Sequence, residues 1–336
     1  MSGFQVEVLR RPEELRALAP AWRELLARCP AGTPFQSPDW LIPWFETFAP
    51  GDLATVAVSR DGGLVALAPL YRETGPLGRR LLPLGISLSD YLDVLIDPGA
   101  PRAGEALVDA LAALGLDWDS LSLEELRPEA AGLTLPAGSM RDDGAAAQSA
   151  CPVLPLRGTL AETLPARKLR KLRMARNRAD RRGDAVIEAV AIDGAGAFLD
   201  ELFRLHALRW RERGEPGVLA DEKVQRFHRR ALPGLIGAGL ARALVARFGN
   251  EVGGAYYGFA DHDRAYAYLG GFDPAFAYES PGTLLVGHAI EDAVSAGCTE
   301  FHFLRGQEAY KYEWGAVDRW NQRWTLRPGE ALRASA

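Results

Sequence analysis

Residues 264–296 constrain the fold more than any other part of the chain. An apolar, alternating run from Arg264 ends on Gly270-Gly271, and a long helix is predicted to begin at Ser280-Pro281-Gly282 and to end near Ala296. Proline in a first helical turn loses no hydrogen bond, and Ser280 can cap the free N–H groups there. Such a helix start directs backbone N–H groups and the positive end of the helix dipole toward a phosphate.

The two glycines allow this strand to bulge or to part from its neighbour, so that an extended ligand can pair with its exposed edge. An ordinary strand, turn and capped helix would give the same pattern, and that alternative stays open. The candidate residues for binding a phosphate-bearing ligand are Leu269, Gly270, Gly271, Ser280, Gly282 and Thr283.

A second informative segment runs from Phe301 to Trp314 and is dense in titratable groups. Attack by an amine on a carbonyl carbon, one reaction that such groups can support, requires a neutral nucleophile and therefore a general base close to it. The oxyanion that forms requires hydrogen-bond donors, for which a strand N–H is suitable. The candidate catalytic residues are Glu308, Asp273 and His302 as bases, with Lys311 and Tyr310 as donors or acids. A salt-bridged connection that covers a sheet edge is the structural alternative for each of them.

The rest of the chain predicts an α+β fold in two halves. Hairpins are expected at Leu53–Tyr71 and Ala241–Ala260, each preceded by helices and followed by a further strand, which indicates an internal duplication. Residues 127–149 are expected to form a loop, and residues 162–182 a basic helix. Leu64–Tyr71 and Tyr91–Ile96 are expected to form one strand each, and Ser37 is expected to cap a helix that begins at Pro38. We therefore predict an N-terminal lobe at residues 1–150 and a C-terminal catalytic lobe at residues 151–336.

Composition excludes several classes of protein. Hydrophobic residues make up 48% and charged residues 25% of the 336 residues, which is typical of a globular protein. The N-terminus has no signal-peptide pattern, and no apolar run approaches the roughly 20 residues that span a bilayer. Three widely separated cysteines give neither a disulfide framework nor a metal-ligand spacing. We expect a cytoplasmic protein with no metal and no membrane insertion.

The charge of the chain is uneven. Nine basic residues and one acid lie between Arg167 and Arg182, which leaves 30 basic and 43 acidic residues elsewhere. Arg167, Arg170 and Lys171 are candidate substrate-binding residues on this helix. They could bind an anionic substrate or the phosphates of a cofactor. There are two alternatives. The helix could contact an RNA acceptor stem, or it could be a solvated helix whose basic residues pair with acidic residues elsewhere in the protein.

Three further side chains are candidates for substrate binding. Asp90 and Tyr91 follow a glycine-containing loop in the first half, where a carboxylate beside an aromatic ring suits a sugar or an amine. Arg209 follows a helical apolar stripe and can face a cleft. Capping of a turn by Asp90 and packing of Tyr91 are the structural alternatives.

In combination these segments resemble a known family. Leu269-Gly-Gly-Phe-Asp-Pro274, the helix start Ser280-Pro-Gly-Thr-Leu-Leu285 and the run Phe303-Leu-Arg-Gly through Tyr310-Lys-Tyr to Trp314 are similar to the GNAT acetyltransferases of the cellulose-biosynthesis (CelD-like) type, which are related to Fem-type aminoacyltransferases. Phe35-Gln-Ser-Pro38 and Ser89-Asp-Tyr-Leu-Asp93 also look like this family's pattern. Two positions depart from it: His302 stands where an acid is common, and Ser-Pro-Gly-Thr replaces the usual glycine-rich phosphate loop.

The resemblance implies two tandem GNAT-like lobes and acyl transfer from acetyl-CoA or another acyl-CoA. The acceptor would be a sugar, an amino compound or a lipid-linked molecule, in envelope or exopolysaccharide biosynthesis. A Fem-like ligase that uses aminoacyl-tRNA and a non-catalytic GNAT-like binding protein are the alternatives. Nucleic acid is expected as a partner only for the ligase.

Overall fold

The computed structural model describes residues 3–100, 102–114, 118–138, 140–211, 214 and 217–329, with the side chains of residues 209–211 left out. The chain forms two compact units, which are described separately. The first unit contains the residues up to Ala150 and those from Arg319 onward, and the second unit is Cys151–Asp318. The predicted second lobe extended to residue 336, whereas the structure places the residues from Arg319 with the first unit.

The first unit contains two sheets and three α-helices in its described part. Its elements in chain order are β1 (Gln5–Leu9), α1 (Pro12–Arg28), η1 (Pro34–Gln36), α2 (Pro38–Phe48), β2 (Asp52–Leu53), β3 (Thr55–Arg60), β4 (Gly63–Ala68), β5 (Leu70–Gly75), β6 (Gly78–Pro83), β7 (Leu95–Ile96), α3 (Ala103–Ala113), β8 (Ser120–Leu126) and η2 (Ala131–Thr134). One sheet has the order β1-β3-β4-β7, and the other contains β8-β6-β5-β2. Strand β15 (Val317–Arg327) joins the second sheet by pairing antiparallel with β8.

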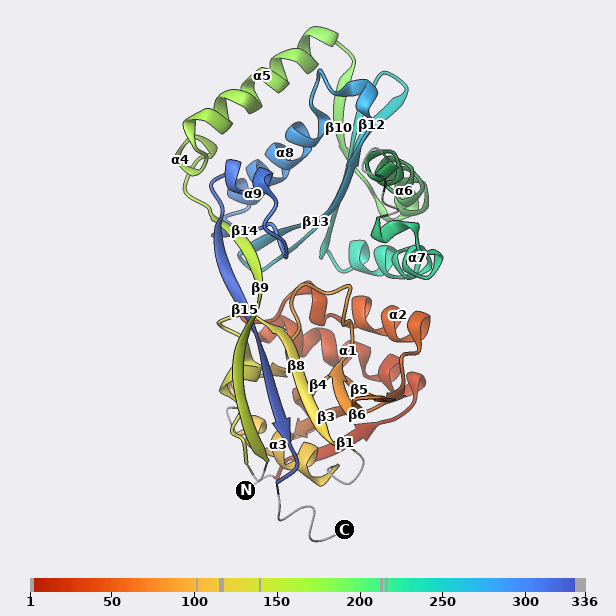
Figure 1. The fold of residues 1–336 in the computed structure, drawn as a ribbon, viewed down its shortest axis with the longest axis vertical. Helices are drawn as coiled ribbons and strands as arrows, with labels where there is room; N and C mark the ends of the chain where they lie inside the picture. The colour runs from red at the N-terminus through yellow and green to blue at the C-terminus, as the bar shows by residue number, and fades with distance from the viewer. Residues whose placement is uncertain are drawn as a thin grey trace. The chain divides into compact units, whose positions relative to one another are not determined.

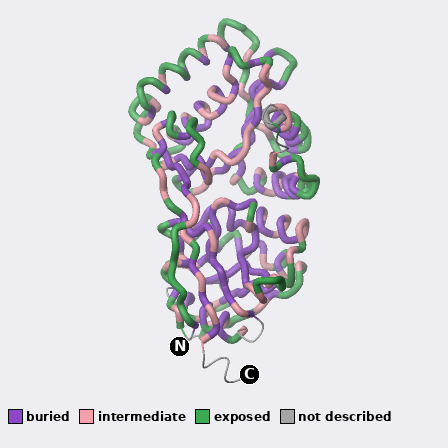
Figure 2. The backbone as a smooth tube through the Cα atoms, in the orientation of Figure 1, coloured by how far each residue is buried: buried purple, intermediate pink, exposed green. Residues whose placement is uncertain are grey.

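The second unit is built on one sheet with helices on both faces. Its elements are α4 (Leu160–Thr163), α5 (Ala166–Arg182), β10 (Ala185–Ala189), η3 (Ile192–Gly194), α6 (Ala195–Arg211), η4 (Val218–Ala220), α7 (Glu222–Gly237), β11 (Ala241–Phe248), β12 (Glu251–Asp261), β13 (Arg264–Phe272), η5 (Pro274–Phe276), α8 (Pro281–Ser295), β14 (Glu300–His302) and α9 (Ala309–Glu313). The strand order is β10-β11-β12-β13-β14-β9, where β9 (Arg141–Pro155) enters from the first unit. Helices α6 and α7 cover one face of β12 and β13, and α8 with α5 outside it covers the other (Figure 1). The central strands are buried between these layers (Figure 2).

The two units share one topology. In each, a strand, two helices and three further strands form a four-stranded antiparallel sheet, and a helix and another strand follow. The order β1-β3-β4-β7 corresponds to β10-β11-β12-β13, with every neighbouring pair antiparallel. Helix α3 then corresponds to α8, and both follow an Asp-Pro dipeptide, Asp97-Pro98 and Asp273-Pro274. The fold is therefore α+β with two tandem GNAT-like lobes.

Local patterns explain most of the elements. Ser37 accepts a hydrogen bond from Trp40 N at 3.2 Å and caps α2 as predicted, with Pro38 in the first turn. Asp61 and Gly62, both at positive φ, form the turn between β3 and β4. Pro69 then separates β4 from β5, so the predicted single strand Leu64–Tyr71 contributes to both sheets of the first unit.

Three predicted elements are wrong in extent. Residues 141–149, expected in a loop, are the first part of β9; their side chains are mostly exposed, so no buried alternation marks the strand. The basic helix, expected at residues 162–182, is broken at Pro165 into α4 and α5. The strand expected at Tyr91–Ile96 is limited to Leu95–Ile96.

Candidate acyl-donor site

Strand β13 has an open edge along its second half. On one side it pairs with β12 as far as Phe272, with a bulge at Tyr268 because Tyr257 faces Leu269 while Gly258 faces Ala267. On the other side it pairs in parallel with β14 only from Arg264 to Tyr266. From Ala267 onward this edge has parted from β14, as the sequence predicted for a strand that contains two glycines.

The two glycines have different roles. A Cβ at Gly271 would lie 2.8 Å from the backbone of Leu205 and His206, so glycine here lets α6 pack directly on the strand. At Gly270 the nearest atom to such a Cβ is Ala255 O, at 3.3 Å. Gly254 on β12 plays a similar part for α8, since a Cβ there would meet Leu285 at 2.9 Å. Small residues therefore fix both helices close to the sheet.

The start of α8 differs in detail from the prediction. Ser280 has φ 58°, in the left-handed region, and its hydroxyl donates to Ala277 O at 3.2 Å rather than capping the helix. Ser280 N donates to Phe276 O and Thr283 N to Ser280 O, while Pro281 has no N–H. Among the described residues no acceptor is found for Gly282 N–H. We expected unpaired amides across residues 280–283, and this turn leaves one.

A pocket of about 600 Å³ lies where the open edge of β13 meets the start of α8. All six residues selected for phosphate-ligand binding line it. Its other lining residues are Lys168, Ala255, Tyr256, Ala267, Tyr268, Phe272, Ala277, Pro281, Leu285, Val286, Glu308, Ala309, Tyr310 and Trp314. Two candidate catalytic residues, Glu308 and Tyr310, thus share a pocket with the candidate donor-binding residues.

Buried Lys311 organises the loop that brings Glu308 and Tyr310 to the pocket. Its Nζ donates to the carbonyls of Leu304, Arg305 and Gly306 at 3.2, 2.7 and 3.0 Å. Leu304 has φ 60° and Gly306 φ 103°, which turns successive carbonyls toward one point. The same Nζ lies 2.9 Å from Glu308 Oε2. Lys311, selected as a donor or acid, does not line the pocket. Its contacts with the carbonyls of residues 304–306 and with Glu308 hold the start of α9 against the preceding loop.

The other two candidate bases lie elsewhere. His302 is 1% exposed, packs against the ring of Tyr266, and has its Nε2 3.0 Å from Glu300 Oε2. Asp273 caps η5 through Ala275 N and pairs with Arg204 at 3.2 Å, beside a separate hollow of about 850 Å³ lined by α6 residues. Neither belongs to the pocket between β13 and α8.

Sequence reasoning missed Lys168, which is the only cation among the described residues that line this pocket. Lys168 is 6% exposed; its Nζ lies 4.0 Å from the centre of the Trp314 ring and 3.6 Å from Glu313 Oε2. Burial lowers the pKa of Lys168, and the Glu313 carboxylate opposes this. The spacing of Lys168 with Leu172, Ala175 and Ala179 places it on the buried stripe of α5, a signal that the sequence contained.

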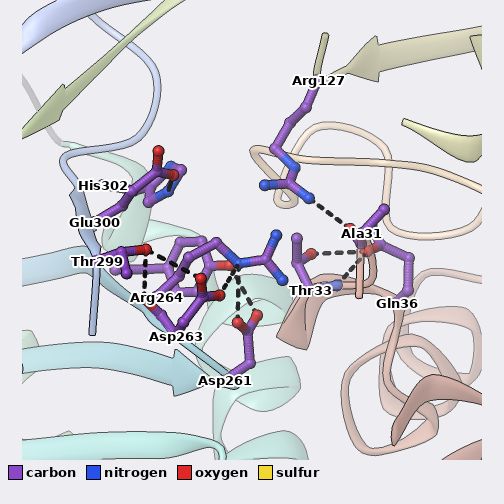
Figure 3. Close-up of polar contacts among 11 residues, drawn as sticks. Ala31, Thr33, Gln36, Arg127, Asp261, Asp263, Arg264, Thr299, Glu300 and His302 are labelled. Carbon is purple, nitrogen blue, oxygen red and sulfur yellow. Dashed lines mark hydrogen bonds and ion pairs between the residues drawn. The ribbon is translucent and has the colours of Figure 1, made fainter. Parts of the chain in front are cut away.

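A buried ion pair stabilises the turn that leads into β13. Arg264 Nε lies 3.1 Å from Asp261 Oδ1 and 3.8 Å from Asp263 Oδ1, and Tyr266 Oη donates to Asp261 at 2.7 Å. Figure 3 shows Arg264 between the two carboxylates, with Thr299 donating to Asp263. Burial raises the pKa of Asp261, while the adjacent guanidinium lowers it. These contacts fix the position from which β13 and β14 diverge.

The residues selected on α5 do not line this pocket. Arg167, Arg170 and Lys171 are exposed on α5, and Lys171 pairs with Glu313 at 3.0 Å. The side chain of Arg209 lies outside the described part of the structure.

Asp90 and Tyr91 belong to the first unit. Tyr91 is 2% exposed, lies under the Arg127 guanidinium, and its carbonyl accepts from Gln36 Nε2. Gln36 in turn accepts from Thr33, and Arg127 donates to Ala31 O, as the first-unit residues in Figure 3 show. These contacts support the packing role of Tyr91.

Among the described residues, no group of histidine, cysteine or acidic side chains could hold a metal ion. In that same part of the chain, no helix combines the length and apolar character of a membrane span.

Comparison with known proteins agrees with the fold. Residues 166–312 match the family model described as Acetyltransferase (GNAT) domain. The chain is similar to the crystal structure of FemX, with a TM-score of 0.68, 12% identity, and coverage of 98% of this chain and 99% of that one. It is also similar to a structure assigned as the C-terminal domain of a lysylphosphatidylglycerol synthetase from Agrobacterium fabrum, with a TM-score of 0.56, 14% identity, and coverage of 97% and 95%. No curated protein matches the chain in sequence. The chain thus has the two-lobe fold of FemX, and residues 166–312 of its second unit match the GNAT acetyltransferase domain.

Proposed function

We propose that the second unit is an acyl-CoA-dependent N- or O-acyltransferase whose donor occupies the pocket between β13 and α8. The observation that carries this proposal is that one pocket of about 600 Å³ is lined jointly by the open edge of β13 and by the start of α8. The open edge offers backbone groups to the amides of a pantetheine arm. Gly282 N–H and the positive end of α8 would face the pyrophosphate.

The proposed chemistry uses two titratable residues at the start of α9, Glu308 and Tyr310. Glu308 would accept the proton of the attacking amine or hydroxyl while the new C–N or C–O bond forms. A backbone N–H of β13 near the bulge at Tyr268 would stabilise the oxyanion. Tyr310, 43% exposed in the pocket wall, would donate a proton to the departing thiolate as the C–S bond breaks. Lys311 would keep Glu308 in position through their contact.

Calorimetric titration with acetyl-CoA and coenzyme A tests the donor assignment. Wild-type protein should bind with about one ligand per chain, and Gly282→Trp should abolish binding because the indole would fill the pocket beside Phe272. Gly196→Trp is the matched control, since nothing lies within 4 Å of a Cβ at that position on α6. Failure of the wild-type protein to bind any acyl-CoA would remove the proposal.

Steady-state kinetics with a panel of amines and amino sugars tests the proposed base. Glu308→Gln should lower kcat by roughly 10²- to 10⁴-fold with little change in donor affinity, because the amide cannot accept the proton, although its oxygen can still accept a hydrogen bond from Lys311. Glu291→Gln, on an outer turn of α8 where Glu291 pairs with Arg176, should leave kcat unchanged. A Glu308→Gln variant with normal kcat would exclude Glu308 as the base.

A second candidate donor is aminoacyl-tRNA. Among the described residues, the start of α8 leaves one unpaired N–H rather than several. The pyrophosphate of coenzyme A would therefore have fewer contacts there, and a donor without that group is the alternative. Transfer of the aminoacyl group from tRNA, together with absent acyl-CoA binding, would support it. The acceptor, in either case, is proposed to be a sugar, an amino compound or a lipid-linked molecule of envelope or exopolysaccharide biosynthesis.

A further inference from the structure

The basic residues of α5 fall into two sets with different surroundings. The first set contacts the rest of the second unit and attaches the helix to it. Its contacts are Lys168 with Trp314, Lys171 with Glu313, Arg176 with Glu291 at 2.6 Å, Arg178 with Tyr278 O at 2.9 Å, and Arg182 with Asp184 at 2.8 Å. The basic side chains on the inner face and the flanks of α5 thus have partners within the second unit.

The second set is Arg167, Arg170, Arg173 and Arg181, which we call the outer arginine face. All four are exposed, and none has an acidic partner in the described part of the structure. At about 100° per residue they lie within an arc of about 120°. The exposed side of α5 is seen along the outer edge of the second unit in Figure 2.

Folding does not explain this face. Like charges three residues apart repel each other along a helix, and no carboxylate in the described part of the second unit forms an ion pair with these four arginines. Acids are nevertheless abundant, because the chain outside this helix carries 43 acidic and 30 basic residues. Asp180, the acid within the helix, lies at the border of the arc. An external anionic partner would remove the repulsion.

The shape and chemistry of the face favour phosphate groups arranged on a surface. From Arg167 to Arg181 the helix is about 21 Å long, enough to reach several headgroups. Guanidinium groups bind phosphate in a bidentate manner. Met174 is 47% exposed within the same arc, and Tyr278, 64% exposed, stacks with Arg178, which lies one helical turn along α5 from Met174. An apolar thioether and an amphipathic ring among arginines suit the boundary between headgroups and acyl chains better than a fully hydrated polyanion.

We propose that the outer arginine face docks the second unit on the surface of a bilayer that contains anionic phospholipid. The helix binds peripherally, with arginine–phosphate contacts and shallow burial of Met174 and Tyr278, and it does not cross the membrane. The proposal is independent of the donor that occupies the pocket between β13 and α8.

Co-sedimentation with lipid vesicles tests this surface. The 336-residue chain should bind vesicles of phosphatidylcholine with about one third phosphatidylglycerol, should not bind pure phosphatidylcholine, and should dissociate as salt rises. Arg170→Gln combined with Arg173→Gln should lower the partition coefficient roughly 30-fold, since each cation near such a surface contributes about 1 kcal/mol. Met174→Ser should weaken binding with little change in its salt dependence.

The matched control removes the same charge from another helix. Lys223 and Arg226 are exposed on α7, which covers the opposite face of the sheet, and Lys223→Gln with Arg226→Gln should leave vesicle binding unchanged. An equal loss in this control would show a net-charge effect and overturn the proposal. Equal binding to neutral vesicles would overturn it as well. Retention of tRNA without vesicle binding would assign the face to nucleic acid instead.

Discussion

At the scale of single residues, Lys311 shows how a titratable side chain near a pocket serves the backbone. Its ammonium group is 3% exposed and lies among three carbonyl oxygens and one carboxylate. A buried lysine is tolerated because its three N–H bonds and its charge are all used. The loop between β14 and α9 therefore depends on it.

Replacing Lys311 should destabilise the second unit. Lys311→Met leaves one buried and two part-buried carbonyls without this donor and should lower the free energy of unfolding by about 3 kcal/mol in urea titration. Lys171→Met removes an exposed ion pair to Glu313 and should cost less than about 1 kcal/mol. A Lys311→Met variant that retains its stability but loses acyl transfer would instead indicate a direct catalytic role.

Asp93 in the first unit should give the protein a measurable pH dependence. Its carboxylate accepts from Val94, Ala131 and Gly132 N–H, yet burial raises the pKa of Asp93 to about 6. Between pH about 4 and 6 the native state holds a proton that the unfolded state has lost, so stability falls as pH rises through this window.

The Asp93→Asn variant isolates this contribution. Between pH 4 and pH 7 the free energy of unfolding should fall further in wild type than in Asp93→Asn. The difference between the two falls should be at most about 3 kcal/mol. Urea titrations of both proteins at several pH values measure this difference. Other groups that titrate in this range contribute equally to both proteins, so their contributions cancel. Parallel pH profiles for the two proteins would contradict the assignment.

At the scale of elements, β13 combines two requirements in neighbouring residues. Its edge must part from β14 to form the pocket, and its face must admit α6 at close range. Gly271 meets the second requirement, because any side chain there would press on the backbone of α6. The glycine pair that suggested a ligand site therefore has a packing role as well.

Two glycine-to-alanine variants should have opposite effects on stability. Gly271→Ala places a Cβ 2.8 Å from the backbone at Leu205 and His206, and should cost about 1–3 kcal/mol. Gly196→Ala, in the first turn of α6 with nothing within 4 Å, should stabilise by about 0.5–1 kcal/mol. Thermal unfolding of both variants compares them directly, and a neutral Gly271→Ala would show that α6 can shift.

At the scale of the whole molecule, the two units are not consecutive in sequence. Strand β15 follows the second unit but completes a sheet of the first, where it pairs with β8. Asn321, Trp324 and Leu326 are buried there, at 1%, 6% and 0% exposure. The first unit therefore requires β15.

Removal of residues 319–336 should unfold the first unit selectively. Loss of a buried tryptophan and leucine alone corresponds to about 4 kcal/mol. Hydrogen exchange should show lost protection across β3, β4 and β8, with β11 and β12 still protected. A shorter truncation that removes only residues 328–336 should leave the first unit protected. Unchanged protection after the longer truncation would mean that β15 is dispensable.

The sequence by itself determined those features that depend on neighbouring residues. The cap of α2, the hairpins, and the run from β13 to α8 follow from local periodicity and turn chemistry, and the six residues selected along that run line one pocket. Tertiary structure alone decided what long-range packing brings together. It placed Lys168 and Trp314 in the pocket wall, removed His302 and Asp273 from it, and returned β15 to the first unit. The physical reason is that local patterns encode which face of an element is buried, whereas the partner of that face is set by contacts between distant segments.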